Sequence, residues 1–389
     1  MPKRSRYDVE DLHPVRTMPP YEPCWCRSGK KWKFCHKIRE AMRPLAFAEL
    51  TANMQVEAKR GYCSHPDAPR GCSNKLIRSH TVQRSGGLSA IAEDGHVLSP
   101  KEGVKFMAQN DGLMVPTKVG INNASTFMGF CGLHDGSMFR PAEHGAVSLN
   151  SEVAFLLSFR SVAYEGYNKI ISKRWSEINR EADAGLPFER QAMFQQMQHW
   201  HRVGTEVAIE DFNIWKEAYD EAFKKNDYSR FWYHAVAFEG VLPIAASGGL
   251  MPEFDFTGKR VQALGELGKT LDHVTVNLTV LEGRTVAVLG WLGEPDDAAQ
   301  QFVRSFAEVP DNDVANALLR LCFEHIENLY LTPSWWNALP GEWQTALVHK
   351  MKNGLPHGER VPAGLLPDGR DYFPNLKVVE RISALPAPA

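Results

Sequence analysis

Hydrophobic and polar residues follow helical spacing in the middle of the chain. After Asn150, which is suited to cap a helix, apolar side chains recur at mostly helical intervals across residues 152–182. A second helix is predicted from about Pro187 to Lys225, because proline is favoured in a first helical turn. Together the two segments predict a helical hairpin.

Strand patterns follow this hairpin. Residues 231–238 are aromatic and β-branched, and residues 273–281 alternate between apolar and polar side chains. Glu282-Gly283 is a hairpin signal that leads into another strand over residues 284–291. Residues 241–256 are also strand-rich. Helical patterns return in three later segments, residues 296–308, 311–330 and 334–352, before a proline-rich tail.

The N-terminal part has much less periodicity. Residues 38–60 predict a helix that is interrupted or begins afresh near Pro44, and residues 61–147 are rich in Gly, Ser, Asn and Pro. A segment of that kind needs something other than apolar burial to order it, and bound metal would suffice. The pattern divides the chain into residues 1–43, residues 44–147 and an α+β domain over residues 148–389.

Charge is unevenly distributed along the 389 residues. The whole chain carries a formal charge of −2, whereas residues 1–43 hold eleven Lys or Arg against five acids. Such a basic arm either draws an anionic partner, most commonly nucleic acid, or is simply solvated. No apolar run approaches the roughly 20 residues that span a bilayer, and no apolar stretch follows the first residues as in a secretion signal. We therefore expect a cytoplasmic protein with no membrane partner.

The seven cysteines favour metal binding over disulfides in such a protein. Six of them lie in the first third of the chain, and Cys322, between Leu321 and Phe323, is expected to be buried and inert. The first three precede a histidine in the pattern C-x-C-x8-C-H, formed by Cys24, Cys26, Cys35 and His36. Zn²⁺ prefers four such ligands in a tetrahedron.

Residues 23–36 resemble the SEC-C motif, the small zinc element found at the tail of the preprotein translocase motor ATPase and appended to many bacterial proteins. The resemblance includes the Gly29-Lys30-Lys31 turn and the aromatic positions beside it. It implies a structural zinc and a docking surface for a protein partner.

A second group of ligands is spread over residues 61–140. Cys63 and Cys72 form one pair, and Cys131 and His134 form the other. Two pairs that lie far apart in sequence suit a treble-clef site bridged by one structural zinc ion. Between the pairs lies His80, after the strand signal Leu76-Ile77.

This order resembles the HNH (ββα-metal) nuclease family. The resemblance implies that His80 is the general base that activates water, that Asn123 or Asn122 orients His80, and that Asp135 holds a hydrolytic Mg²⁺ or Mn²⁺. Asp135 stands where the family usually has His or Asn, and Ser79 stands where an Asp often helps to bind the metal. A base that titrates near neutrality and a hard cation are the groups that phosphodiester cleavage needs.

Structural interpretations of the same residues remain open. His80 is alternatively a zinc ligand or a core histidine in a purely structural treble clef, and His65 is an alternative ligand to Cys63. In the predicted helix 311–330, Glu324, Glu327 and Asn328 share one face, which we interpret as a solvated rim or a capping network.

The sequence as a whole predicts a metal-dependent nucleic-acid hydrolase with DNA or RNA as its partner, an architecture associated with bacterial defence. The alternative is a non-enzymatic, zinc-stabilised adaptor that binds a protein, the ribosome or nucleic acid. The net charge of −2 favours this alternative, because non-specific nucleases are often strongly basic.

Overall fold

The computed structural model describes residues 9–73, 75–100, 106, 109–143, 147–264, 269–354 and 361–387. Its chain forms two units. The first contains Met1–Gly61, Gly166–Ile214 and Gly265–Lys269, and the second contains Tyr62–Glu165, Trp215–Leu264 and Thr270–Ala389. The long helices α6 (Ser151–Asn179) and α7 (Phe188–Lys225) contribute residues to both units.

In the first unit, the predicted hairpin is present. The second half of α6 is followed by the short helix η4 (Arg180–Asp183) and by the first part of α7. The helices pack closely where α6 has Gly166, since a Cβ there would lie 2.0 Å from the Phe212 ring of α7. Shorter elements complete the unit, namely η1 (Trp32–Phe34), η2 (Arg39–Ala41) and α1 (Phe47–Ala58).

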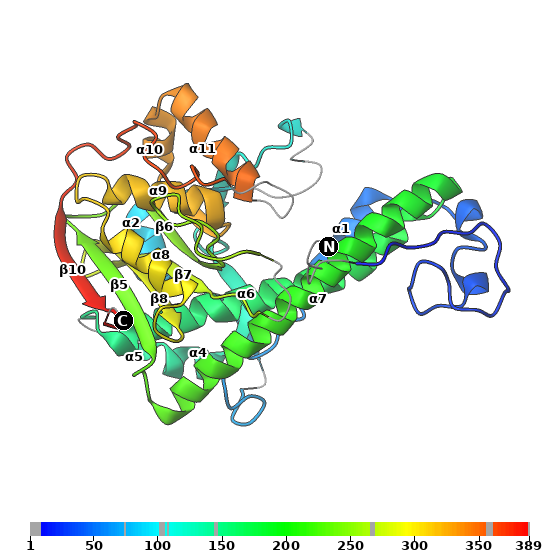
Figure 1. The fold of residues 1–389 in the computed structure, drawn as a ribbon, viewed down its shortest axis with the longest axis horizontal. Helices are drawn as coiled ribbons and strands as arrows, with labels where there is room; N and C mark the ends of the chain where they lie inside the picture. The colour runs from blue at the N-terminus through cyan, green and yellow to red at the C-terminus, as the bar shows by residue number, and fades with distance from the viewer. Residues whose placement is uncertain are drawn as a thin grey trace. The chain divides into compact units, whose positions relative to one another are not determined.

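The main sheet lies in the second unit and is antiparallel (Figure 1). Among the described residues it has eight strands in the order β10-β5-β8-β7-β6-β9-β2-β3. The Glu282-Gly283 hairpin is confirmed, because both residues have positive φ, at 50° and 77°, as a tight hairpin turn requires. The strands of the sheet are β5 (Phe231–Phe238), β6 (Ile244–Leu250), β7 (Val274–Leu281), β8 (Arg284–Leu292), β9 (Leu329–Leu331), β10 (Val378–Ala384), β2 (His96–Pro100) and β3 (Pro116–Gly120).

The two faces of this sheet are buried in different ways. Val274, Val276 and Leu278 point into an apolar core that also contains α8 (Ala298–Ala307) and α9 (Val314–His325). The opposite face is polar, and its Thr275 donates a 2.7 Å hydrogen bond to Ser158 of α6. The remaining helices of this region are α10 (Pro333–Ala338) and α11 (Gly341–Gly354), of which α11 packs on α9 (Figure 1).

A separate two-stranded sheet precedes these elements in the chain. β1 (Leu76–His80) pairs antiparallel with β4 (Thr126–Cys131), and α4 (Gly132–Met138) begins directly after β4. Strands β2 and β3 of the main sheet lie between β1 and β4 in the chain. Short helices connect it to its neighbours, namely η3 (Arg84–Leu88), α2 (Ser89–Ile91) and α5 (Arg140–Glu143).

The structure corrects three predicted elements and shortens a fourth. The helix predicted over residues 334–352 is divided into α10 and α11, with Leu339 and Pro340 between them. The helix predicted over residues 311–330 ends at His325, and Leu329–Leu331 instead form strand β9 beside β6. The proline-rich tail contains strand β10, which pairs with the edge of β5. The helix predicted over residues 38–60 is α-helical only at Phe47–Ala58, because Pro44 prevents a continuous helix.

Candidate metal centres and active site

The first group of predicted ligands is brought together in the structure. The ligand atoms of Cys24, Cys26, Cys35 and His36 all lie within 4.8 Å of one another. His36 Nδ1 lies 3.2 Å from the sulfurs of both Cys24 and Cys35, and Cys26 Sγ lies 3.6 Å from Cys35 Sγ. One ion at the centre of this group would meet four soft or borderline ligands.

Tight turns rather than a large core shape this segment. The amide of Cys24 donates a 2.9 Å hydrogen bond to the carbonyl of Lys30, and Gly29 adopts a φ of +75°. The cluster of buried side chains here is small, and half of its members are the ligand cysteines themselves (Leu12, Cys24, Trp25, Cys26, Trp32 and Cys35). So little apolar burial suggests that metal binding supplies the order.

Asp183 completes the first site, and the sequence did not predict it. This fully buried carboxylate lies 3.1 Å from His36 Nε2 and also accepts a 2.6 Å hydrogen bond from Arg39. Burial alone would lower the pKa of His36, but the carboxylate of Asp183 and the Cys26 sulfur outweigh it and raise the pKa to about 11. A histidine held in this way presents Nδ1 to a metal ion and Nε2–H to the carboxylate.

The second group is also assembled. The ligand atoms of Cys63, Cys72, Cys131 and His134 lie within 4.8 Å of one another, with His134 Nδ1 3.4 Å from Cys63 Sγ and 3.6 Å from Cys72 Sγ. His65 does not replace Cys63. Its ring instead stacks on the His134 ring, with centroids 3.8 Å apart.

An irregularity in β4 positions Cys63. The register with β1 shifts between Ile77 and Ser79, so that Met128 and Gly129 oppose a single residue of β1. The carbonyls of Met128 and Gly129 accept hydrogen bonds from the amides of Tyr62 and Ser64, at 3.1 and 2.7 Å. The chain on either side of Cys63 is thereby fixed next to Cys131.

Both groups consist of three cysteines and one histidine, and the described residues contain no third group of at least three His, Cys, Asp or Glu that could hold an ion. The pKa of Cys131 falls to about 6 although burial alone would raise it, because backbone and side-chain hydrogen bonds favour its thiolate. A thiolate is the form that binds metal. The donor chemistry therefore fits a metal ion at each group.

His80 lies outside both groups, at the end of β1. Its Nε2 is 3.4 Å from the carbonyl oxygen of Ile121, and the residue is half-buried. Burial lowers its pKa below the ordinary value, and the positive charges of Arg84 and Arg160 act in the same direction. His80 is therefore neutral near pH 7, which is the form a general base needs.

Asp135 follows the ligand His134 in the first turn of α4. Its charge acts on His80, raising the pKa of the imidazole, so the two side chains are electrostatic neighbours. Asp135 Oδ1 is buried and has no hydrogen-bond partner among the residues that the structure describes, and the same is true of Ser79 Oγ. A buried carboxylate oxygen without a partner is costly unless a cation or water satisfies it.

Asn122 and Asn123 make contacts that the sequence did not predict. Asn123 Oδ1 accepts a 2.7 Å hydrogen bond from Arg78, and Asn122 Oδ1 accepts one of 3.1 Å from Arg84. The side chain that was expected to orient His80 is thus engaged with an arginine. The group near the imidazole from this turn is the backbone carbonyl of Ile121.

The residue after His80 is anchored by a buried polar network. Asn328 donates to Thr81 Oγ1 at 2.6 Å and to the carbonyl of Ser247 at 2.8 Å, and its Oδ1 accepts from Tyr330. The predicted solvated rim around Glu324 and Asn328 is wrong, because both side chains are only 4% exposed. Sequence reasoning missed this network because its members lie in segments more than 80 residues apart.

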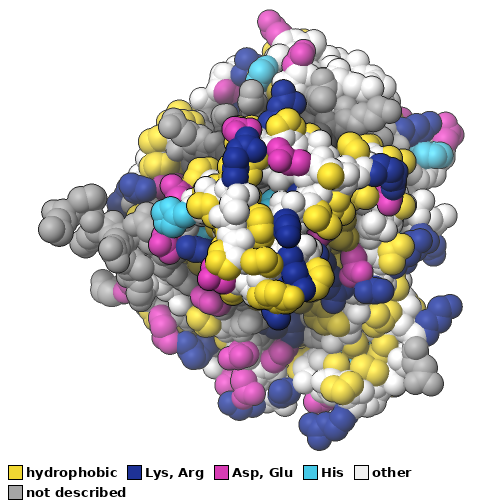
Figure 2. Space-filling view, turned by 90° about the vertical axis from the view of Figure 1, so that its right-hand side faces the viewer, with side chains coloured by type: hydrophobic (Ala, Val, Ile, Leu, Met, Phe, Trp, Pro, Cys, Tyr) yellow, Lys and Arg dark blue, Asp and Glu magenta, His cyan; other side chains and the backbone are white. Residues whose placement is uncertain are grey.

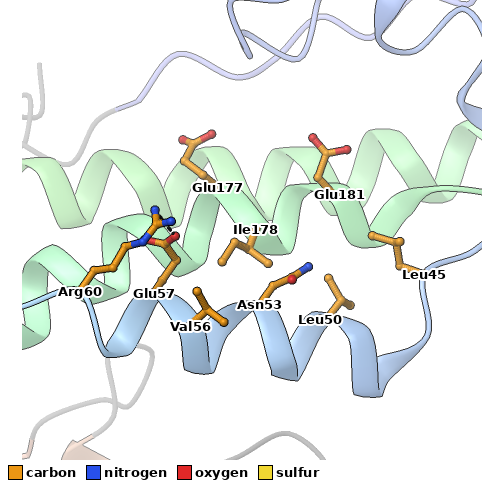
Figure 3. A pocket seen from close by; sticks show the side chains of 9 residues that line it. All are labelled: Leu45, Leu50, Asn53, Val56, Glu57, Arg60, Glu177, Ile178 and Glu181. Atoms are coloured by element: carbon orange, nitrogen blue, oxygen red, sulfur yellow. Dashed lines mark ion pairs between the residues drawn. The ribbon is translucent and has the colours of Figure 1, made fainter.

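A groove of about 480 Å³ lies between α1 and the α6–η4 segment (Figure 3). Leu50, Val56 and Ile178 contribute apolar side chains to it, while Glu57 forms an ion pair with Arg60 at 2.7 Å. Cysteine and histidine are absent from its described lining. Among its described lining residues, the groove therefore offers no thiolate or imidazole of the kind that forms the two Cys₃His groups.

Comparison with protein-family models, with curated proteins and with solved structures finds no match for this chain. Within the described ranges, none of the helices is both long and apolar enough to cross a bilayer. The geometry and chemistry of the site are therefore the basis for assigning a function.

Proposed function

We propose that the protein is a metal-dependent hydrolase of nucleic-acid phosphodiesters, in which both Cys₃His groups hold structural zinc. Zinc suits these groups because it accepts three thiolates and an imidazole in a closed tetrahedron, which leaves no open position for substrate. Catalysis then belongs to His80 and Asp135, which lie beside the second group but are not part of it.

The observation that carries this proposal is that His80 and Asp135 lie on β1 and α4, two elements that contact each other. The imidazole is neutral and outside the zinc ligands, and the neighbouring carboxylate has a buried oxygen with no partner in the described part of the chain. A structural zinc module needs neither feature. A hydrolytic site needs both.

In this mechanism His80 accepts a proton from water as the water oxygen forms a bond to phosphorus. The bond from phosphorus to the leaving oxygen breaks, that oxygen takes a proton from a solvent water molecule, and His80 returns its proton to solvent, which yields a phosphate monoester and an alcohol. Asp135 would hold a Mg²⁺ or Mn²⁺ ion, which would neutralise charge on the phosphate oxygens in the transition state. The carbonyl of Ile121, 3.4 Å from Nε2, limits the rotation of the imidazole.

The experiment is a cleavage assay with supercoiled plasmid DNA and with labelled RNA, in Mg²⁺ or Mn²⁺. Wild-type protein should cleave at least one of them, and His80→Ala and Asp135→Asn should each lose at least about 100-fold in rate. His96→Ala is the matched control, because His96 lies on β2 with its Nδ1 on the Asp94 carbonyl. Zinc content is measured in every preparation, so that loss of fold is recognised.

A second candidate, a protein-binding adaptor, is favoured by the surface of the N-terminal zinc segment. Tyr21, Phe34 and Ile38 are 65%, 67% and 51% exposed, and Lys33 lies over the rings of Tyr21 and Phe34. Figure 2 shows hydrophobic, basic and acidic side chains interleaved on the face toward the viewer. A mixed apolar and basic surface of this kind suits an acidic protein partner.

The basic charge of this segment is less available than the sequence suggested. Arg16, Arg27 and Lys30 pair with Glu189, Glu10 and Glu181. Binding of a protein partner that survives Asp135→Asn but not Phe34→Ala, together with no turnover of either nucleic acid, would replace the hydrolase by the adaptor.

A further inference from the structure

Two arginines flank His80 along the chain, and each is held by a neutral amide. Arg78 precedes His80 by two residues on β1 and donates to Asn123 Oδ1 at 2.7 Å. Arg84 follows at the start of η3 and donates to Asn122 Oδ1 at 3.1 Å. Because side chains two apart on a strand share a face, Arg78 lies on the same face of β1 as His80.

The charges of these two guanidinium groups are not neutralised. Both side chains are exposed, and no carboxylate pairs with either of them among the described residues. Other arginines of the chain are different: Arg160 pairs with Glu143, and Arg230 pairs with Glu294. An unpaired arginine next to a candidate active site is available for an anionic ligand.

The amides hold the arginines without cancelling their charge. Asn122 and Asn123 lie in a turn fixed by backbone hydrogen bonds of 2.9 and 3.0 Å from the amides of Asn123 and Ala124 to the carbonyl of Gly120. One guanidinium nitrogen is used in each contact, and the remaining donors are left for a ligand. Preorganisation of this kind reduces the entropy lost on binding.

We propose that Arg78 and Arg84 form a phosphate clamp for the backbone of a nucleic acid, with Asn122 and Asn123 as its positioning residues. The clamp rests on the proposed hydrolase function, because it names the substrate contacts of the same site. Guanidinium groups match phosphate oxygens in geometry and charge, and they bind them independently of base sequence. The clamp therefore predicts recognition of the phosphodiester backbone in DNA or in RNA.

The test measures binding without turnover. In the His80→Ala protein, with no added divalent cation, the affinity for a fluorescent DNA of about 20 nucleotides and for an RNA of the same sequence is measured by anisotropy at several salt concentrations. Arg78→Ala and Arg84→Ala should each weaken binding about 5- to 10-fold and reduce the salt dependence by roughly one phosphate contact. The nucleic acid that the parent protein binds more tightly is the preferred ligand.

Matched variants distinguish a specific effect of Arg78 and Arg84 from the general effect of removing a positive charge. Arg230→Ala removes an exposed arginine of the same unit that is paired with Glu294 and should change binding by less than about 2-fold. Arg78→Lys and Arg84→Lys should retain part of the affinity, and Asn122→Ala and Asn123→Ala should lose about 2- to 3-fold. Zinc content and circular dichroism show that each variant is folded.

The outcomes distinguish the clamp from the hydrolase. Arginine-dependent binding by a protein that never cleaves would retain the clamp and remove the hydrolase. Equal binding by the Arg78→Ala, Arg84→Ala and parent proteins would overturn the clamp even if cleavage is observed. Absence of binding to both nucleic acids would also overturn it.

Discussion

At the scale of single residues, the histidines of this chain differ in how burial and charge act on them. His36 is held by a fully buried Asp183, which favours its protonated form when no metal is bound. His80, which is half-buried, and His234, which is buried, have no carboxylate contact of this kind among the described residues, and burial lowers the pKa of both. The same side chain thus serves as ligand, candidate base and core residue within one protein.

Asp183 should be essential for the stability of the first metal site. Asp183→Asn removes the charge that orients His36 and favours its metal-binding tautomer, and we expect metal affinity at this site to fall about 10- to 100-fold. Zinc release to a chromophoric chelator should gain a fast phase of about one zinc per chain. The control Glu189→Gln, which removes an exposed partner of Arg16, should leave the release unchanged. Identical release by Asp183→Asn and wild type would exclude this role.

His234 should make the protein less stable in mild acid. Its ring is 2% exposed and accepts or donates a 2.6 Å hydrogen bond with Ser383, and burial lowers its pKa to about 4. In the unfolded chain, His234 takes up a proton near the ordinary histidine pKa of about 6.5. The stability that the neutral His234 contributes to the folded protein is therefore complete above that pH and is lost as the pH falls toward 4. The loss amounts to at most about 3 kcal/mol.

The measurement is urea unfolding of wild type and His234→Asn at about pH 7.5 and about pH 5, on either side of the ordinary histidine pKa. The variant should be less stable at the higher pH but should lose less free energy of unfolding between the two pH values. An equal loss in both proteins would show that His234 does not titrate in this range.

At the scale of elements, the shift in β4 depends on one glycine. A Cβ at Gly129 would lie 1.9 Å from the ring of Phe127, which is 2% exposed and packs edge-on against Phe130 and Tyr164. Any shift of the ring would disturb these two aromatic contacts. The carbonyl of Gly129 also accepts from Ser64, so this residue links the strand to the segment that carries Cys63.

Gly129→Ala should therefore lower the free energy of unfolding by about 2 kcal/mol or more and weaken zinc binding at the second site. Gly136→Ala is a matched control, because Gly136 belongs to helix α4 and, beyond its chain neighbours and the backbone of that helix, no atom of the described residues lies within 4 Å of the position that the alanine methyl group would occupy. That variant should be neutral or stabilised by up to about 1 kcal/mol. Chemical denaturation and zinc analysis provide the comparison, and equal stability of the two variants would contradict this packing argument.

The elements that the sequence predicted well are those with a strong local signal. β5, β7 and β8 follow from aromatic and β-branched residues and from a turn that requires positive φ. β9 and β10 could not be predicted in this way, because β9 has three residues beside a helix and β10 is a partly exposed edge strand after a proline-rich segment. Their pairing with distant strands determines their conformation.

In the candidate site, too, local sequence patterns predicted some contacts, and contacts between distant residues could not be predicted. The spacing of Cys and His predicted which residues come together, because close pairs of ligands are a local pattern. Asp183 contacts His36 across 147 residues of sequence, and Asn328 contacts Thr81 across 247 residues. No local sequence pattern predicts contacts between residues so far apart. The arginine contacts of Asn122 and Asn123 likewise depend on a turn that only the structure shows.

At the scale of the whole molecule, the two kinds of core predict different responses to metal removal. The main sheet encloses a large apolar cluster with Trp291, Phe302 and Phe306 almost completely buried. The segment around Cys24 has only a small buried cluster, and residues 62–73 around Cys63 have no buried apolar side chain. Apolar burial of about 1.5–3 kcal/mol per large side chain should keep the main sheet folded without metal.

Treatment with a strong zinc chelator should therefore produce partial rather than global unfolding. Hydrogen exchange should become fast around residues 20–40 and 62–75 and stay slow in β5, β7 and β8. Readdition of zinc should restore protection. Uniform loss of protection across the main sheet, or no change anywhere, would contradict the structural role assigned to the two ions.

The measurement that tests the central claim most directly is the rate of phosphodiester cleavage by fully zinc-loaded wild type and His80→Ala in the same Mn²⁺ buffer. The account predicts measurable cleavage of DNA or RNA by wild type and a loss of at least about 100-fold in the variant at equal zinc content. Equal rates in the two proteins, or no cleavage of either nucleic acid by the wild type, would contradict it.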